Sequence, residues 1–496
     1  MFFRLILAGR RDAVFYLLQS QNVLIFQFEA GRIRMPDTNV SSRNRKTAVI
    51  SGKLRKAPPS ALVWAWQALH LLDGAAAPSS AQEALESVLS ALSDTERRDR
   101  NLTAEYFYGA LRQEIRLQWL LRRLLPQPEK LPLPLRRLLL VAAYGMLFLE
   151  RVPAYAVIST AVSAAQCVYG PGLGKLVNGV LRSLQRWGNS VHEASFYVEQ
   201  GEAADSPAVR ARFLSLPENV YALWERAYGR DVAEKLARRS QTRPVAAFRV
   251  HAARPQAQAL REQLLHAEGQ ASGALAVGTW GVAFPRGAPV ASGEETLASL
   301  MADGRLSSQS AGSQWLMAAL WRTAGLGEAP LWDACCGYGG KSALAAEQGA
   351  HVGFCSDASW QRLRQLPQHF QRLQLTVPPL ALADGRRPPV RQWEGNILAD
   401  VPCSGLGVLA RRPDIRRHTG RMADFPQLQY DIALALAQRL LPGRCLVYMT
   451  CTLRPAENEQ VVQRLESAGL RCLEQLQTPH DHPFMEGMFG AVLQRN

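Results

Sequence analysis

Apolar residues follow a helical spacing through the front part of the chain. Within residues 61–72 they recur three and four positions apart. The run 133–149 is almost wholly apolar, but Arg136 and Arg137 interrupt it, so it predicts a buried core helix and not a membrane span. The whole pattern predicts a compact all-α bundle over residues 59–190. The helices we expect there cover 61–72, 115–125, 133–149, 154–167 and a last segment from 175.

The pattern changes twice after residue 190. Residues 191–325 combine short helical stretches with strand-like runs at 242–251 and 275–284, which predicts a helical connector and a small α+β subdomain. From residue 326 to 496, short apolar runs alternate with helical segments, as in a doubly wound α/β domain. The strands we expect in this last domain cover 329–332, 351–355, 380–383, 397–399 and 446–449.

Residues 1–58 form a basic leader, with eleven Lys and Arg against three Asp and Glu. Its apolar stretch, 13–28, is broken by Gln, Ser and Asn and is shorter than the roughly 20 apolar residues of a spanning helix. We expect the leader to be disordered or partly a misassigned start, with Met35 as the alternative first residue. An organellar transit peptide is a further alternative, and a secretory signal fits poorly.

Charge and cysteine usage limit the class of partner and the compartment. The net charge is +15, which favours a polyanionic partner such as nucleic acid, although a basic surface without such a partner is the alternative. Eight cysteines are sparse for 496 residues and no CxxC pair occurs. We therefore expect a cytoplasmic protein in a reducing compartment, monomeric, without a metal site and without a membrane partner.

A glycine-rich turn follows the first strand of the last domain. The strand ends at Asp333, and residues 333–342 read Asp-Ala-Cys-Cys-Gly-Tyr-Gly-Gly-Lys-Ser before an alanine-rich helix. This arrangement predicts a cradle for a nucleotide-like ligand, although the spacing matches neither a Walker loop nor GxGxxG. Asp357 ends the next strand and suits a ribose diol, and Asp384 ends the third and suits an adenine amino group. Capping of a strand end is the alternative for each carboxylate.

Two cysteines, Cys403 and Cys451, each follow a buried strand. Open α/β sheets place their active sites at the carboxyl ends of strands, so both thiols are expected in one cleft. Two thiols there suggest covalent chemistry with separate attack and release roles. Small buried apolar residues are the alternative.

These segments resemble a known family. Residues 400–408, 411–416, 450–452 and 457–459 are similar, in order, to motifs of the Nol/Nop/Sun family of RNA cytosine-5 methyltransferases. Residues 106–112, 144–153 and 175–182 resemble a NusB-type RNA-binding domain, and the front and catalytic domains together look RsmB-like. The resemblance implies a multi-domain α and α/β fold. It consists of an all-α NusB-like bundle, a small α+β connector and a Rossmann-like class I methyltransferase domain.

The resemblance also implies a reaction. The enzyme would transfer a methyl group from S-adenosylmethionine to C5 of a cytosine in RNA, here 16S ribosomal RNA. In the family's terms Cys451 would be the nucleophile at C6, Cys403 would help remove the C5 proton, and Asp400 would hydrogen-bond the cytosine ring. The implied cofactor-binding residues are Cys335, Cys336, Gly337, Tyr338, Gly339, Gly340, Lys341, Asp357, Asp384 and Asp400. The candidate RNA contacts are Arg249, Arg411, Arg412 and Arg416, and Arg417 beside them is a further phosphate candidate.

The cofactor turn departs from the family pattern. Cys336, Gly337 and Tyr338 replace the family's Ala-Ala-Pro, while Gly339, Gly340 and Lys341 remain. This change motivates an alternative function, a non-catalytic RNA-binding factor of ribosome assembly with a degenerate methyltransferase domain. A DNA cytosine methyltransferase is a weaker alternative, because it explains neither Cys451 nor the NusB-like segment.

Overall fold

The structure is a computed structural model that divides into two compact units. We call Pro36–Arg243 with Leu409–Thr419 the helical unit, and Met1–Met35, Pro244–Val408 and Gly420–Asn496 the α/β unit. Residues 191–325, expected to hold a helical connector and a small α+β subdomain, are divided between the two units after Arg243. The described residues are 16–18, 23–27, 52–73, 80–90, 97–266, 273–285, 287, 291–292 and 295–496.

The helical unit is a bundle around one large apolar core. Local sequence signals set its helix ends: the Ser60 hydroxyl accepts the Val63 N–H at 3.3 Å, and Gly170, at φ +88°, joins the sixth helix to the seventh. The predicted bundle is confirmed. Its first helices are α1 (Ala61–Leu71), α2 (Ala81–Leu89), α3 (Arg97–Arg112), α4 (Glu114–Leu124), α5 (Leu133–Phe148), α6 (Ala154–Tyr169) and α7 (Pro171–Arg186). They are followed by α8 (Pro207–Phe213), α9 (Glu218–Tyr228) and α10 (Arg230–Gln241), with 3-10 turns at Leu54–Lys56, Pro128–Lys130, Gly188–His192 and Ala194–Tyr197.

Within the α/β unit, the chain after Pro244 first forms a four-stranded antiparallel sheet of order β4-β5-β3-β8. Helices α11 and α12 pack on it, as the expected α+β subdomain requires. Its elements are β3 (Ala246–Val250), α11 (Ala257–His266), β4 (Leu275–Val277), β5 (Gly281–Phe284), β6 (Ala291–Ser292), β7 (Glu295–Thr296), α12 (Leu297–Ala302), β8 (Leu306–Ser308) and α13 (Ala311–Leu320).

A nine-stranded sheet forms the rest of this unit, in the order β1-β2-β11-β10-β9-β12-β13-β15-β14. Its central strands β11, β10, β9, β12 and β13 are parallel, and β15 runs antiparallel between β13 and β14. The predicted Rossmann-like methyltransferase arrangement is confirmed. The strands are β9 (Leu331–Asp333), β10 (Val352–Asp357), β11 (Leu380–Leu382), β12 (Asn396–Asp400), β13 (Cys445–Thr450), β14 (Leu470–Gln477) and β15 (Phe489–Arg495). The accompanying helices are α14 (Gly340–Glu347), α15 (Trp360–Leu363), α16 (Leu366–Arg372), α17 (Phe425–Ala437) and α18 (Glu459–Ser467), with 3-10 segments at Leu406–Val408, Pro413–Asp424 and Pro455–Glu457.

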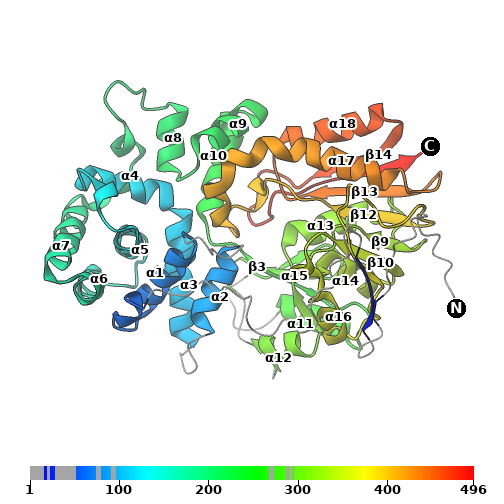
Figure 1. Ribbon diagram of the computed structural model, residues 1–496, viewed down its shortest axis with the longest axis horizontal. Coiled ribbons are helices and arrows are strands. Elements are labelled where there is room, and N and C mark those ends of the chain that lie inside the picture. The colour runs from blue at the N-terminus through cyan, green and yellow to red at the C-terminus, as the bar shows by residue number, and fades with distance from the viewer. Residues whose placement is uncertain are drawn as a thin grey trace. The chain divides into compact units, whose positions relative to one another are not determined.

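Helices cover both faces of this sheet (Figure 1). Successive strand residues point to opposite faces, so Trp332 packs with α17 and α18 while its neighbour Leu331 packs with α13 and α14. Tyr448 and Val447 in β13 divide between the two faces in the same way. Burial on both sides explains why these strands read as continuous apolar runs.

Three stretches of the leader differ from the expected disorder: the 3-10 turn Leu54–Lys56 of the helical unit and two strands. Tyr16–Leu18 (β1) and Val23–Gln27 (β2) pair antiparallel, and β2 adds to the sheet in parallel beside β11. The apolar residues of this segment are thus strand residues, a role that its broken pattern did not indicate. The alternative start at Met35 lies outside the described residues. In the described part of the chain, no helix has the length and apolar character needed to cross a bilayer.

Candidate active site

The carboxyl ends of four neighbouring parallel strands bring the predicted site residues to one edge of the sheet. Asp333 ends β9, Asp357 ends β10 and Asp400 ends β12. Cys451 follows β13 directly, and Cys403 lies three residues beyond β12. The sequence prediction that these groups share one edge therefore holds in the structure.

The glycine turn takes backbone conformations that suit glycine. Gly337 has φ +55° and Gly339 has φ +82°, where it forms the N-cap of α14. A Cβ at Gly339 would lie 2.8 Å from Leu366 Cγ, whereas one at Gly340 would meet nothing within 4 Å. The Gly337 N–H donates to Asp357 Oδ2 at 2.9 Å, which joins the turn to the end of β10. The turn is therefore a close-fitting cradle that leads into a helix N-terminus.

We expect Gly339→Ala to destabilise the α/β unit and Gly340→Ala to leave it almost unchanged. A left-handed backbone costs a residue with a Cβ about 1–2 kcal/mol, and Leu366 must also move. Thermal unfolding of the two variants measures the difference. Equal melting temperatures would contradict the left-handed geometry of the turn.

Asp333 is buried at the base of this turn, with 1% of its surface exposed. The Ser342 hydroxyl donates to its Oδ2 at 2.5 Å. Burial raises the pKa of Asp333 to about 7; the Ser342 hydrogen bond opposes that rise and the nearby Asp400 carboxylate adds to it. Its Oδ1 is buried and accepts no hydrogen bond from the described part of the chain. This atom is an acceptor suited to a bound polar group.

The two other candidate ligand carboxylates differ in exposure. Asp357 is 4% exposed and accepts a second backbone N–H, from Ser359 at 2.7 Å. Asp384 is partly exposed, and the hydrogen bond from Arg386 holds its pKa below the ordinary value. Both remain at the strand ends where the sequence placed them.

The side chains of the turn itself divide between core and surface. Cys336 is buried and packs with Cys355 and Phe370, so its role is to fill the core behind the turn. Cys335 is partly buried, and burial raises the pKa of its thiol. Tyr338 is 50% exposed at the top of the turn. The three residues that replace the family pattern are thus a buried core thiol, a glycine with positive φ and an exposed tyrosine.

The two cysteines lie against each other. Their Sγ atoms are 3.1 Å apart, both thiols are free, and the Cys451 N–H donates to Cys403 Sγ at 3.4 Å. The hydrogen bond with Cys451, and then burial, raises the pKa of Cys403 well above the ordinary value for a thiol. The Cys403 thiol is therefore a weaker acid than an ordinary thiol, and both cysteine side chains are partly exposed.

Lys341 and Asp400 form an ion pair beside the thiols. Burial lowers the pKa of Lys341, but the charge of Asp400 and its hydrogen bond outweigh burial, so the pKa of Lys341 is above its ordinary value. Lys341 is therefore a fixed positive charge at this edge, and it orients the Asp400 carboxylate. No spacing or motif in the sequence indicated that these two residues pair.

A buried polar network that sequence reasoning missed holds the two cysteine loops together. Glu457 is fully buried, and its Oε2 accepts the Ser404 N–H at 2.9 Å and the Gln429 amide at 2.9 Å. The Ser404 and Thr452 hydroxyls are hydrogen-bonded at 2.8 Å, so each residue that follows a cysteine contacts the other. Asn458 accepts from the Thr450 hydroxyl at 2.7 Å. The similarity of residues 457–459 to a family motif was the only signal in the sequence, and it did not indicate which residues Glu457 and Asn458 contact.

Arg249 is not placed for the RNA contact that the sequence suggested. It is 2% exposed, and its guanidinium donates to both Glu347 oxygens, at 2.7 and 2.9 Å, and to Gln309 at 2.9 Å. Glu347 is 1% exposed, so the pair is a buried ionic link between β3 and α14. This burial argues against a phosphate contact and gives Arg249 a structural role.

The arginines that follow the Cys403 loop belong to the helical unit. Arg416 is 6% exposed and its guanidinium is fully engaged with carbonyl and hydroxyl oxygens, which argues against the predicted RNA contact. Arg412 pairs with Asp414 at 2.9 Å but is partly exposed, as is Arg411. An RNA contact by Arg411 and Arg412 stays a prediction.

Comparison with known proteins agrees with this geometry. Residues 326–480 match the family model described as 16S rRNA methyltransferase RsmB/F, and residues 63–186 match the NusB family. A probable ribosomal RNA small subunit methyltransferase B of Synechocystis is 32% identical over 383 residues, covering 74% of this chain and 80% of that protein. One of Bacillus subtilis is 30% identical over 394 residues, covering 76% and 82%. The crystal structure of a protein designated PH0851 has the same fold, with TM-score 0.67 and 16% identity over 88% of this chain and 99% of that one.

Proposed function

Because the chain belongs to the RsmB/F family of 16S rRNA methyltransferases, we propose that it methylates C5 of a cytosine in small-subunit ribosomal RNA, with S-adenosylmethionine as the methyl donor. The family is one of S-adenosylmethionine-dependent methyltransferases. The observation that carries the cytosine-5 assignment is the contact between Cys403 and Cys451, whose sulfur atoms lie 3.1 Å apart beside Asp400. Two adjacent thiols suit a reaction that needs both a nucleophile and a base.

The residues of the glycine turn fit the methyl donor. Asp357 would accept from the ribose hydroxyls and Asp384 from the adenine amino group, while the turn lets the backbone approach closely. The free Oδ1 of Asp333 offers a further acceptor for the donor's ammonium group. When bound, the donor supplies a methyl group activated by attachment to a positively charged sulfur.

The chain's own residues would activate the cytosine. C5 of cytosine is a poor nucleophile, and addition of the Cys451 thiolate to C6 makes C5 electron-rich. The Asp400 carboxylate, oriented by Lys341, would accept a hydrogen bond from the exocyclic amino group. Cys403 would first release its own proton to water. Once C5 carries the methyl group, the Cys403 thiolate would take the C5 proton, and Cys451 would leave C6 as a thiolate. The thiolate of a thiol with a raised pKa is the stronger base, which suits this last step.

The target base must leave its stack to reach these thiols. Single-stranded regions of RNA present such bases without the cost of opening a pair. The NusB-like helical unit and the partly exposed Arg411 and Arg412 would supply sequence-independent affinity for the flanking backbone.

Two measurements test the proposal. Calorimetry should detect binding of S-adenosylmethionine to the purified protein, and bisulfite mapping should reveal a 5-methylcytosine in 16S ribosomal RNA incubated with protein and cofactor. RNA binding without cofactor binding would favour the alternative, a non-catalytic assembly factor. Methyl transfer to a position other than cytosine C5 would contradict the assigned chemistry.

A further inference from the structure

Eleven residues from the middle of the methyltransferase sequence fold as part of the helical unit. The chain of the α/β unit passes through the Cys403 loop, leaves that unit after Val408 and returns at Gly420. Leu409–Thr419, which we call the inserted segment, thus lies in the sequence between the Cys403 loop and α17. It begins six residues after Cys403. Six residues of extended chain reach at most about 20 Å, so the start of the segment lies within that distance of Cys403.

The last residues before the inserted segment are fixed to the catalytic cysteine. The Gly407 N–H donates to the Cys451 carbonyl at 3.0 Å, and the Gly407 carbonyl accepts the Gly487 N–H at 2.9 Å. A Cβ at Gly407 would lie 1.8 Å from the Gly487 carbonyl oxygen, so the backbones meet closely. A displacement of the chain beyond Val408 therefore acts directly on the backbone that carries Cys403 and contacts Cys451.

Within the helical unit, buried arginines hold the inserted segment. Arg416 donates to the Ser215 carbonyl at 3.1 Å and to the Ser240 carbonyl and hydroxyl, both at 2.8 Å. It also donates to Leu409 at the start of the segment, at 2.8 Å. From α3, Arg112 donates to the Ala410 carbonyl at 3.0 Å. The segment is thus fixed to the unit at both of its ends.

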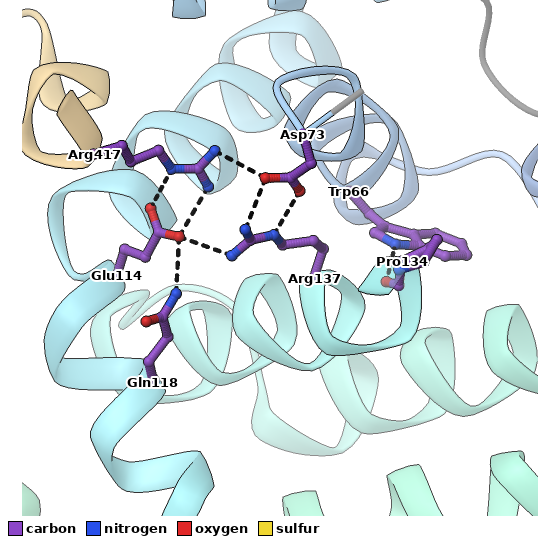
Figure 2. Close-up of polar contacts among 7 residues, drawn as sticks. All are labelled: Trp66, Asp73, Glu114, Gln118, Pro134, Arg137 and Arg417. Atoms are coloured by element: carbon purple, nitrogen blue, oxygen red, sulfur yellow. Dashed lines mark hydrogen bonds and ion pairs between the residues drawn. The ribbon is translucent and has the colours of Figure 1, made fainter. Parts of the chain in front are cut away.

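Arg417 completes the attachment through a network of four charges (Figure 2). Its guanidinium donates to Glu114 in two hydrogen bonds, at 2.7 and 2.9 Å, and reaches Asp73 at 3.3 Å. Arg137 of α5 contacts the same two carboxylates, with two bonds of 2.7 Å to Asp73 and one of 2.8 Å to Glu114. Gln118 adds a hydrogen bond to Glu114 at 2.9 Å.

This network favours one position of the segment. All four charged side chains are at most 16% exposed, so the carboxylates are poorly hydrated and depend on both guanidinium groups. Glu114 also lies in the first turn of α4, where a negative charge is favourable. The Arg417 guanidinium is occupied by two acids and is therefore not a free phosphate ligand.

We propose that Arg417 is a positioning residue for methyl transfer: by pairing with Glu114 and Asp73 it fixes the inserted segment to the helical unit and so sets the position of the loop that carries Asp400 and Cys403. The inference rests on the proposed function. Arg137 shares both acids but lies on α5 and holds no part of the inserted segment, so it is a matched control.

The test compares Arg417→Met with Arg137→Met in the full-length protein. Both should lower the melting temperature of the helical unit, Arg137→Met at least as much, because it removes the shorter contacts to Asp73. At a temperature where both are folded, Arg417→Met should lower kcat about 10- to 100-fold with little change in RNA affinity. Arg137→Met should keep kcat near that of the unaltered protein.

Several outcomes would overturn the inference. One is a kcat of Arg417→Met equal to that of Arg137→Met. Another is an Arg417→Met variant that loses only RNA affinity, which would make Arg417 an RNA contact. If Arg417→Met does not fold, Arg417→Lys, which keeps the charge and loses the planar fork, should show a smaller loss of kcat, and no loss would contradict the role. An unaltered protein that transfers no methyl group would contradict the proposed function instead. In that case amide hydrogen exchange still decides the inference: residues 400–408 should exchange faster in Arg417→Met than in Arg137→Met, and equal rates would overturn it.

Discussion

Replacing Cys451 by alanine is expected to abolish methyl transfer, whereas replacing Cys403 should leave the protein trapped on its RNA. Without the Cys451 sulfur no bond to C6 forms, and kcat should fall by about a thousandfold or more. Without Cys403 the bond to C6 still forms and the methyl group still transfers, but the C5 proton stays in place. The covalent complex therefore accumulates in one variant and is absent from the other.

Denaturing gel electrophoresis with radiolabelled RNA and S-adenosylmethionine distinguishes the two variants. Cys403→Ala should give a slowly migrating adduct and Cys451→Ala should give none. Cys472→Ala is the matched control, because it removes a free, partly buried thiol in β14, away from the paired thiols, and should behave like the unaltered protein. The reverse pattern would exchange the two roles.

Replacing Arg249 by alanine is expected to destabilise the α/β unit strongly. It leaves Glu347 buried at 1% exposure without its partner, and breaking a buried pair costs about 3–5 kcal/mol. Arg305→Ala is the control in the same unit, since Arg305 pairs with Glu295 at the surface and its loss should matter far less.

Denaturant unfolding, followed by a signal from the α/β unit, measures both effects. The double variant Arg249→Met with Glu347→Leu should recover much of the lost stability, because no unpaired charge remains. Unchanged stability of Arg249→Ala together with weakened RNA binding would instead support the phosphate contact first suggested by the sequence.

The sequence predicted the elements whose signals are local. The helix expected at 154–167 is Ala154–Tyr169, because Pro153 and Gly170 set its ends. The strand expected at 397–399 lies within Asn396–Asp400, because burial on both faces makes the run apolar. The sequence also predicted that Asp333, Cys403 and Cys451 share one edge of the sheet. Each lies at or just after the end of an expected parallel strand, and parallel strands end on one side of the sheet.

The sequence could not predict contacts between distant positions. Arg417 meets Asp73 across 344 positions, and a run of arginines reads the same whether it faces acids, carbonyl groups or phosphate. Arg249, Arg416 and Arg417 were therefore interpreted as RNA contacts. The structure buries the first two and pairs Arg417 with Glu114 and Asp73. The Glu457 network and the inserted segment were missed for the same reason, because no local spacing marks a long-range partner.

Mass spectrometry of the trapped complex tests the covalent assignment most directly. Trypsin releases Cys403 and Cys451 on separate peptides, because Arg411 and Arg444 lie between them. With RNA and S-adenosylmethionine, Cys403→Ala should carry a methylated cytidine nucleotide on Cys451 after nuclease digestion. A nucleotide on any other residue, or methylated RNA from a variant lacking Cys451, would contradict the account.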